Sequence, residues 1–84
     1  MLMTYVKGVR WEREVKERLE RHGWLVFRCA GSKPIDLIAF RSGKLPLWVE
    51  CKTRGRPAKW KVAYWGGEAA LCGAKYIVAR KYRH

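Results

Sequence analysis

The sequence is poor in acidic residues. Only 7 of its 84 residues are Asp or Glu, against 19 Lys or Arg, which leaves a formal net charge of +12. Such a charge favours binding to a polyanion. A membrane surface is one polyanion, but no apolar run approaches the roughly 20 residues that span a bilayer, and the clearest helix is not a basic amphipathic anchor. We therefore expect a nucleic-acid partner, no membrane and no small-molecule substrate.

The sequence also lacks the cysteine spacing of a zinc site or a disulfide framework. Cys29, Cys51 and Cys72 are odd in number and form no CxxC pair, so we expect reduced, mostly packed thiols. Residues 1–10 contain no apolar core of a signal peptide. Together these absences predict a cytoplasmic protein, in a prokaryotic cell or a virus-infected host cell.

The length predicts a single domain over residues 1–84. A chain of this size buries only roughly 60–65% of the surface that its unfolded form exposes. A partner subunit or unusually dense packing is therefore expected. Five Trp, four Tyr and two Phe side chains supply large packing units.

Hydrophobic periodicity and turn residues predict six elements in the order α-β-β-β-α-β. This order is typical of an α/β fold with a small mixed sheet and flanking helices. Gly66 and Gly67 inside the second helix cost roughly 1 kcal/mol each relative to alanine. The expected elements are a helix from Val6 or Gly8 to Arg21, strands over residues 24–30, 35–40 and 47–53, a helix over residues 59–71 and a strand over residues 76–80.

One glutamate of the first helix differs from the others. Trp11, Val15 and Leu19 recur at helical spacing and form an apolar stripe. At about 100° per residue, Glu12 and Leu19 lie only about 20° apart around the helix axis. Glu12 is therefore expected to point with the core stripe, while the remaining glutamates of this helix point away. These are Glu14, Glu17 and Glu20.

A second group of charged residues lies on the predicted central strands. Side chains alternate along a strand, so Glu50 and Lys52 share one face and Cys51 points to the other. Asp36 opens the neighbouring strand and can lie close to Glu50, while Glu12 can approach that face from above. Carboxylates inside a basic protein suit the coordination of Mg²⁺, for which Mn²⁺ is expected to substitute. We therefore predict a metal-dependent nuclease site.

Each residue of this site has an expected role. Asp36 and Glu50 would bind the metal directly, and the backbone carbonyl of Cys51 could add a ligand. Glu12 would bind through water or a second metal. Lys52 would orient or deprotonate the attacking water, or neutralise charge developing at phosphorus. Each residue also has a structural alternative: a solvated Glu-Lys pair, a turn aspartate or a glutamate at the core boundary.

The stretches around these residues carry a resemblance to a known family. They are residues 8–14 (GVRWERE), residues 28–39 (RCAGSKPIDLIA) and residues 49–52 (VECK). Over about residues 7–80 the chain resembles the archaeal-type Holliday-junction resolvases, which belong to the PD-(D/E)xK nuclease superfamily. The most specific part is the Ala-Gly-Ser-Lys-x-x-Asp stretch that ends at Asp36.

The resemblance implies the nuclease core of that superfamily, a Mg²⁺-dependent endonuclease activity and a homodimer. Glu12, Asp36, Glu50 and Lys52 match the catalytic set, and Ser32 matches a serine at the rim of the site. The chain departs from the family in being short and in residues 54–65, which are richer in Trp and Gly than the family leads us to expect. Aromatic side chains of that segment could stack on bases or form core or dimer contacts.

Basic residues are expected to face the DNA. By the resemblance, Arg13 and Arg28 match positions that face the DNA, and Lys33 lies in the same conspicuous stretch. Independently, two groups of basic residues flank the predicted site and could contact phosphates regardless of sequence, although they could also serve only solubility. These groups comprise Lys7, Arg10, Arg13, Arg54, Arg56, Lys59 and Lys61.

These observations predict an endonuclease that binds branched DNA and resolves four-way junctions by two symmetric nicks. A two-fold homodimer would supply two active sites that match the symmetry of the junction. One alternative is a small virus-type replication-repair nuclease of the same superfamily that acts on flaps or nicked duplex. A second alternative is a basic DNA-binding module without activity, against which the clustered acids argue because they repel phosphate.

Overall fold

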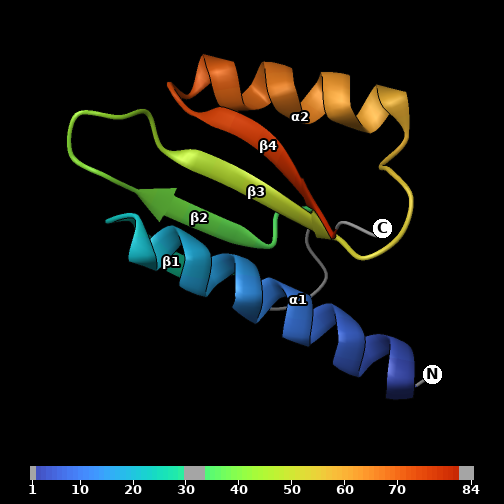
Figure 1. The fold of residues 1–84 in the computed structure, drawn as a ribbon. Coiled ribbons are helices and arrows are strands. Elements are labelled where there is room, and N and C mark those ends of the chain that lie inside the picture. Colours follow the sequence, from blue (N-terminus) through green and yellow to red (C-terminus); the bar gives the residue numbers. More distant parts are fainter. Residues whose placement is uncertain (1, 30–33, 82–84) are drawn as a thin grey trace.

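The computed structural model describes residues 2–29 and 34–81. Within these residues, one four-stranded sheet lies between two helices (Figure 1). The predicted order α-β-β-β-α-β is confirmed. The elements are α1 (Leu2–Arg21), β1 (Leu25–Arg28), β2 (Leu37–Phe40), β3 (Leu47–Lys52), α2 (Lys59–Leu71) and β4 (Lys75–Arg80).

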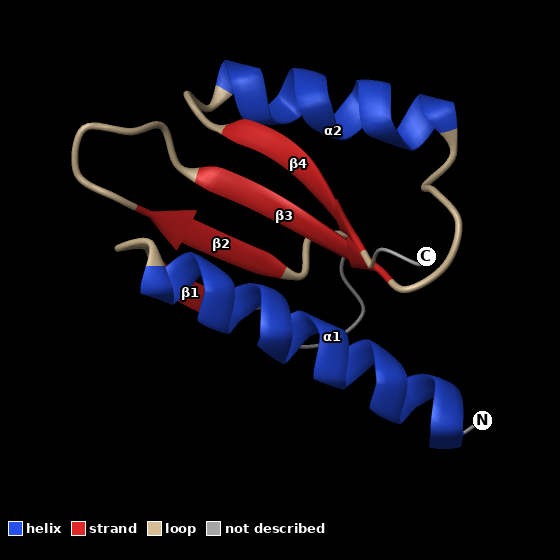
Figure 2. Ribbon diagram, in the orientation of Figure 1, coloured by secondary structure: helices blue, strands red, loops and turns tan. Residues whose placement is uncertain are grey.

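The sheet is mixed, as predicted, and its spatial order follows the chain. Strands β1, β2 and β3 are antiparallel neighbours, and β4 pairs parallel to β3. Parallel neighbours need a crossover connection, which α2 supplies between β3 and β4 (Figure 2). The start of β2 and the ends of β3 and β4 consequently lie at one end of the sheet (Figure 1).

The element boundaries differ from the predicted ones mainly at the first helix. Helix α1 begins at Leu2, several residues before the predicted start at Val6 or Gly8. Gly8 does not stop the helix, because an interior glycine costs only about 1 kcal/mol and residues 2–7 contain no proline. Strand β1 ends at Arg28, short of the predicted 24–30 range, whose last residue lies outside those described. The predicted bounds of α2 are confirmed despite its two glycines.

The hydrophobic core lies between α1 and one face of the sheet. Trp11 and Val15 of α1 pack on Leu37, Ala39 and Val49, and all five are buried. The indole Nε1 of Trp11 also donates a hydrogen bond of 3.0 Å to the Ala79 carbonyl of β4. The predicted apolar stripe of the first helix therefore holds α1 across the sheet.

The opposite face of the sheet is only partly covered. Helix α2 packs there through Trp65, whose ring centroid lies 6.5 Å from that of Trp48 on β3, and through the buried Ala69. Toward β1 and β2 the face remains open, where Phe27 and Phe40 meet edge to face with more than two fifths of each side chain exposed. No helix among the described residues has the length and apolar character needed to cross a membrane.

Candidate nuclease site

The predicted Glu-x-Lys pair lies on β3, on the face that α2 partly covers. Trp48 contacts α2 from this face, and strand alternation places Glu50 and Lys52 beside it. Val49 points the opposite way into the α1 core, and Cys51 packs against the same core. The prediction that Cys51 faces away from the Glu-x-Lys pair is therefore confirmed.

Asp36 joins the ends of three strands. Its backbone N–H donates to the Val49 carbonyl on β3 at 2.9 Å, and its backbone carbonyl accepts from the Cys29 N–H next to β1 at 2.9 Å. Its carboxylate atom Oδ2 accepts a 2.7 Å hydrogen bond from the backbone N–H of Cys51. Because Leu37 pairs with Val49, Asp36 stands next to Glu50 in the strand register. The predicted proximity of Asp36 to Glu50 follows from these contacts.

Glu50 is buried and has a partner that sequence reasoning missed. Only 7% of its surface is exposed, and its Oε1 accepts a hydrogen bond of 2.5 Å from the Tyr76 hydroxyl on β4. In the parallel β3–β4 register Tyr76 pairs with Trp48. Trp48 lies two residues before Glu50 on the same face of β3. Tyr76 and Glu50 are 26 apart in sequence, and only the alternation of Tyr76 and Val78 on the last strand could have pointed to this contact.

Glu12 approaches Asp36 from the other layer of the molecule. Helix α1 packs on the face that carries Val49, so Glu12 does not lie over the Glu50–Lys52 face as predicted. Its side chain is 19% exposed, and its Oε1 accepts a 3.3 Å hydrogen bond from the Arg28 Nε of β1. The predicted inward direction of Glu12 agrees with this burial. Arg28, expected to face DNA, is half exposed and forms an ion pair with Glu12.

The electrostatics connect these acids through Asp36. Burial raises the pKa of Asp36, and the Glu50 carboxylate acts in the same direction, whereas the Cys51 N–H and Lys52 lower it. Burial also raises the pKa of Glu12, with the Asp36 charge adding to the increase and Arg28 opposing it. Asp36 is thus the residue through which the carboxylates of the two layers interact.

The carboxylates match a hard divalent cation in chemistry but are not gathered into a three-ligand group. Among the residues described, no three His, Cys, Asp or Glu side chains are close enough together to hold a metal ion. Asp36 and Glu50 each use one carboxylate oxygen in the hydrogen bonds above, which leaves the second oxygen of each as a potential ligand. Burial raises the pKa of the Cys51 thiol to about 12, so its side chain stays protonated and is a poor ligand.

The family model described as archaeal Holliday junction resolvase (Hjc) matches residues 3–65. The chain belongs to the archaeal Holliday junction resolvase family. The match includes Glu12, Asp36, Glu50 and Lys52, and β4 with Tyr76 lies beyond it. The resemblance noted from the sequence is thereby confirmed, together with the α/β fold expected of such a nuclease.

A similar curated protein is the crossover junction endodeoxyribonuclease Hjc of Methanocaldococcus jannaschii. It is 50% identical over 56 residues, which cover 67% of this chain and 41% of that relative. The chain therefore spans less than half the length of the curated resolvase that it matches. No solved structure matches the chain significantly.

The predicted DNA-facing residues of this resolvase-family chain fall in two layers. Arg10 and Arg13 are exposed on α1 and Arg28 is exposed on β1, while the others that are described follow β3, in α2 or in the loop before it. The N-terminal half of α1 and the loop after β3 nevertheless lie at the same end of the molecule (Figure 1). Arg54, Arg56 and Lys59 are exposed and Lys61 is half-buried. The predictions for Ser32 and Lys33, and for the side chain of Lys7, lie outside what the structure describes.

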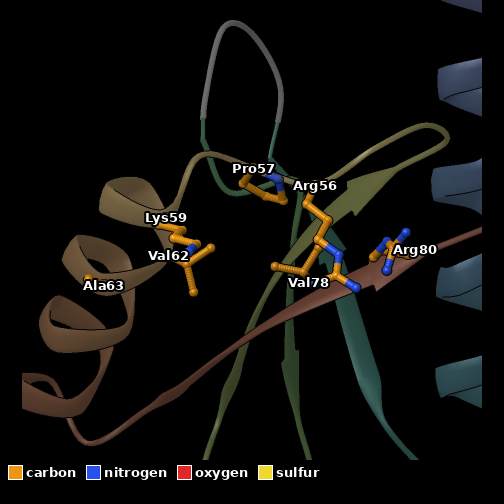
Figure 3. Close-up of a pocket in the computed structure, with 7 residues that line it drawn as sticks. All are labelled: Arg56, Pro57, Lys59, Val62, Ala63, Val78 and Arg80. Atoms are coloured by element: carbon orange, nitrogen blue, oxygen red, sulfur yellow. The ribbon is translucent and has the colours of Figure 1, made fainter.

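Some of these basic residues border a cavity of about 560 Å³ between α2 and β4. Arg56 and Lys59 line it together with Arg80, which sequence reasoning did not select (Figure 3). Arg80 ends β4 and pairs with Lys52 in the strand register. Its Nε donates a 3.2 Å hydrogen bond to the Gly55 carbonyl, which connects the basic loop to the sheet.

Proposed function

We propose that the chain is a Mg²⁺-dependent endonuclease that binds branched DNA and resolves four-way junctions by paired, symmetric nicks. The observation that carries this proposal is the position of the Asp36 carboxylate at the junction of β2 and β3, next to Glu50 in register and hydrogen-bonded to the Cys51 N–H. Membership of the archaeal Holliday junction resolvase family supports the same activity.

In this proposal Asp36 and Glu50 hold the metal through their remaining carboxylate oxygens, and the Cys51 carbonyl adds a ligand. Glu12 reaches the ion through water, because it comes from the other face and is paired with Arg28. When bound, Mg²⁺ supplies Lewis-acid stabilisation of negative charge at phosphorus, and Mn²⁺ can replace it. Tyr76 fixes the orientation of the Glu50 carboxylate through the hydrogen bond to Oε1.

Lys52 is the cation of the proposed site. It shares a strand face with Glu50, and its ammonium lowers the pKa of Asp36. There it would orient or deprotonate the attacking water, or neutralise charge that develops at phosphorus in the transition state. The basic residues around the site would hold the DNA backbone without reading its sequence.

The proposal includes a homodimer that works in the cytoplasm. One chain contributes one site, whereas paired nicks need two sites related by the symmetry of the junction. The exposed apolar side chains of α2, including Trp60 and Tyr64, offer a surface that a second subunit could cover. This surface is also where the composition departs from the resolvase family.

The proposal is tested by incubating the protein with Mg²⁺ and end-labelled four-way junction, flap, nicked and linear duplex DNA. We expect symmetric nicks confined to the junction, and no cutting in EDTA. Preferential cutting of flaps or nicked duplex would assign the chain to the replication-repair alternative. Binding to all four substrates without cutting any of them would leave only a DNA-binding module.

A further inference from the structure

We propose that the cavity between α2 and β4 binds one unpaired nucleotide of the DNA substrate, with the base against its apolar wall and the phosphate among its cations. This inference deepens the proposed function and rests on DNA being the substrate. A volume of about 560 Å³ is typical of cavities that hold a small organic ligand. Figure 3 shows the side chains of α2, of the preceding loop and of β4 around this cavity.

The wall of the cavity combines apolar surface with positive charge. Pro57 and Val62 on one side and Val78 on the other supply apolar surface, while Arg56 and Arg80 supply guanidinium groups. Among the described residues that line the cavity, none is acidic. An uncharged apolar molecule would satisfy only the apolar part of this lining, and a free phosphate only the cationic part. A nucleotide satisfies both, because its base has an apolar face and its phosphate pairs with arginine.

The start of α2 adds positive potential next to the cavity. The N-terminal cap residue Ala58 makes no side-chain capping hydrogen bond, and the first turn contains no acidic residue. Instead, Lys59 and Lys61 lie in that turn, where the helix dipole disfavours cations. Natural proteins commonly break such local sequence preferences at functional sites. Here a bound phosphate would offset both the lysines and the helix dipole.

The cavity lies directly beside the proposed catalytic pair. In the parallel β3–β4 register, Val78 is the neighbour of Glu50 and Arg80 is the neighbour of Lys52. Both cavity residues therefore share the sheet face of the Glu-x-Lys pair. The hydrogen bond from Arg80 to the Gly55 carbonyl holds the loop at this position. A nucleotide in the cavity would thus be adjacent to the phosphodiester at Glu50 and Lys52.

This placement gives branched DNA an advantage over linear duplex. A base enters the cavity only if it leaves the helical stack, which costs least where pairing is already interrupted, as at a branch or a bulge. A fully paired duplex would contact the surrounding arginines and lysines but leave the cavity empty. The cavity would therefore contribute specificity for interrupted DNA, while the basic surface contributes general affinity.

The test fills the cavity without altering its charge. Ala63 lines it from α2, so Ala63→Trp occupies the volume. The matched control is Ala70→Trp, which lies seven residues further along the same helix and outside the cavity, and both alanines are exposed. Fluorescence anisotropy in EDTA compares a duplex that contains one unpaired thymidine with the same duplex fully paired.

We expect the parent protein to bind the interrupted duplex more tightly than the paired one. Ala63→Trp should lose roughly tenfold affinity for the interrupted duplex, in line with the worth of one stacked base. Its affinity for the paired duplex should change less than about twofold, and Ala70→Trp should behave like the parent. Because an added Trp could itself stack on DNA, a second pair of variants places a negative charge inside or outside the cavity. Val62→Glu should lose the preference, and Leu71→Glu should keep it.

Three results would overturn the proposal. One is a parent without preference for interrupted DNA, and another is an equal loss on both duplexes, which would make the cavity part of a general phosphate track. The third is a change in oligomeric state confined to Ala63→Trp, which would assign the cavity to a second copy of the chain. Because binding is measured in EDTA, a protein that shows the cavity effect but cuts nothing would refute only the nuclease. A protein that cuts junctions without the cavity effect would refute only the cavity.

Discussion

The two faces of the sheet bury very different side chains. The face under α1 is apolar apart from Arg28 on β1, and Leu37, Ala39 and Val49 on it are completely buried. The face toward α2 instead carries the buried Glu50, and near β1 its Phe27 is half exposed. Burying a carboxylate costs free energy that burying Val or Leu would not. The first face therefore accounts for most of the stability, and the second carries a stability cost that the proposed catalysis would explain.

The two helices also cover the two faces of the sheet to different extents. Helix α1 packs on β1, β2 and β3, and Trp11 is hydrogen-bonded as far as β4. Helix α2 packs mainly on β4 and leaves the opening that forms the basic cavity. In the proposed function this face must admit DNA, which it could not do if its own helix closed it. The difference indicates that substitutions on the α1 face should affect folding, whereas those on the α2 face should affect catalysis and binding.

The largest expected effect is on cleavage. Asp36→Asn and Lys52→Ala should each reduce the rate of junction cutting by roughly 10²–10³ or more, the usual cost of losing a charge that stabilises the transition state. Binding should survive, because it rests on arginines and lysines elsewhere. Single-turnover cleavage and anisotropy measure the two effects, with Lys44→Ala in the β2–β3 turn as a control for lost positive charge. Near-normal cutting by either variant would remove that residue from the mechanism.

A second prediction concerns stability and compares one residue from each face. Leu37→Ala leaves a cavity in the α1 core and should cost about 2–5 kcal/mol of unfolding free energy. Phe27→Ala removes a larger side chain from the open face but should cost about 1 kcal/mol or less. Urea denaturation of the two variants gives both values. Equal losses would contradict the assignment of stability to the α1 face.

A third prediction isolates the hydroxyl of Tyr76. Tyr76→Phe keeps the ring but removes the hydrogen bond that orients Glu50. Groups that orient a metal ligand typically contribute about 10- to 100-fold to metal affinity, so the Kd for Mn²⁺ should rise at least tenfold. Isothermal titration calorimetry measures this, with Tyr64→Phe as the control because Tyr64 is exposed on α2. Identical Kd values for parent and Tyr76→Phe would show that the contact is structural only.

A smaller effect is expected in the pH dependence of stability. Burial raises the pKa of Asp36 above its ordinary 3.8, with Glu50 contributing, so the ionised form opposes folding. Asp36→Asn keeps a hydrogen-bond acceptor for the Cys51 N–H and should melt a few degrees higher than the parent at neutral pH. The difference should shrink as the pH falls through the raised pKa and vanish below about 3.8. Melting curves of both proteins between pH 3 and pH 7 would measure this difference. If it grew as the pH fell, the ionised Asp36 would stabilise the fold, which contradicts the prediction.

Local patterns were sufficient to predict much of this molecule. The bounds of α2, the order of the elements and the shared face of Glu50 and Lys52 follow from periodicity within single segments. Asp36 could be selected because it comes directly before the strand that pairs with β3. These features depend on residues that are close together in the sequence, so the sequence alone can reveal them.

What the sequence did not reveal depends on how distant segments pack. The layer from which Glu12 approaches was predicted wrongly, because periodicity identifies the buried side of α1 but not the sheet face that it covers. Tyr76 and Arg80 were missed because the hydrogen bond of Tyr76 to Glu50 and the pairing of Arg80 with Lys52 depend on the parallel β3–β4 register. The Arg28–Glu12 pair likewise joins β1 to α1 across 16 residues, and no local signal predicts it.

The most direct test of the functional assignment of these acids is thermal unfolding of the parent and Asp36→Asn, each in EDTA and with Mg²⁺. If Asp36 is kept for metal binding at a cost in stability, Asp36→Asn melts higher than the parent in EDTA and gains much less from Mg²⁺, because a ligand stabilises only the fold that binds it. If Asp36→Asn instead melts lower in EDTA and both proteins respond equally to Mg²⁺, the carboxylate is a structural partner of the Cys51 N–H and the metal site does not exist as proposed.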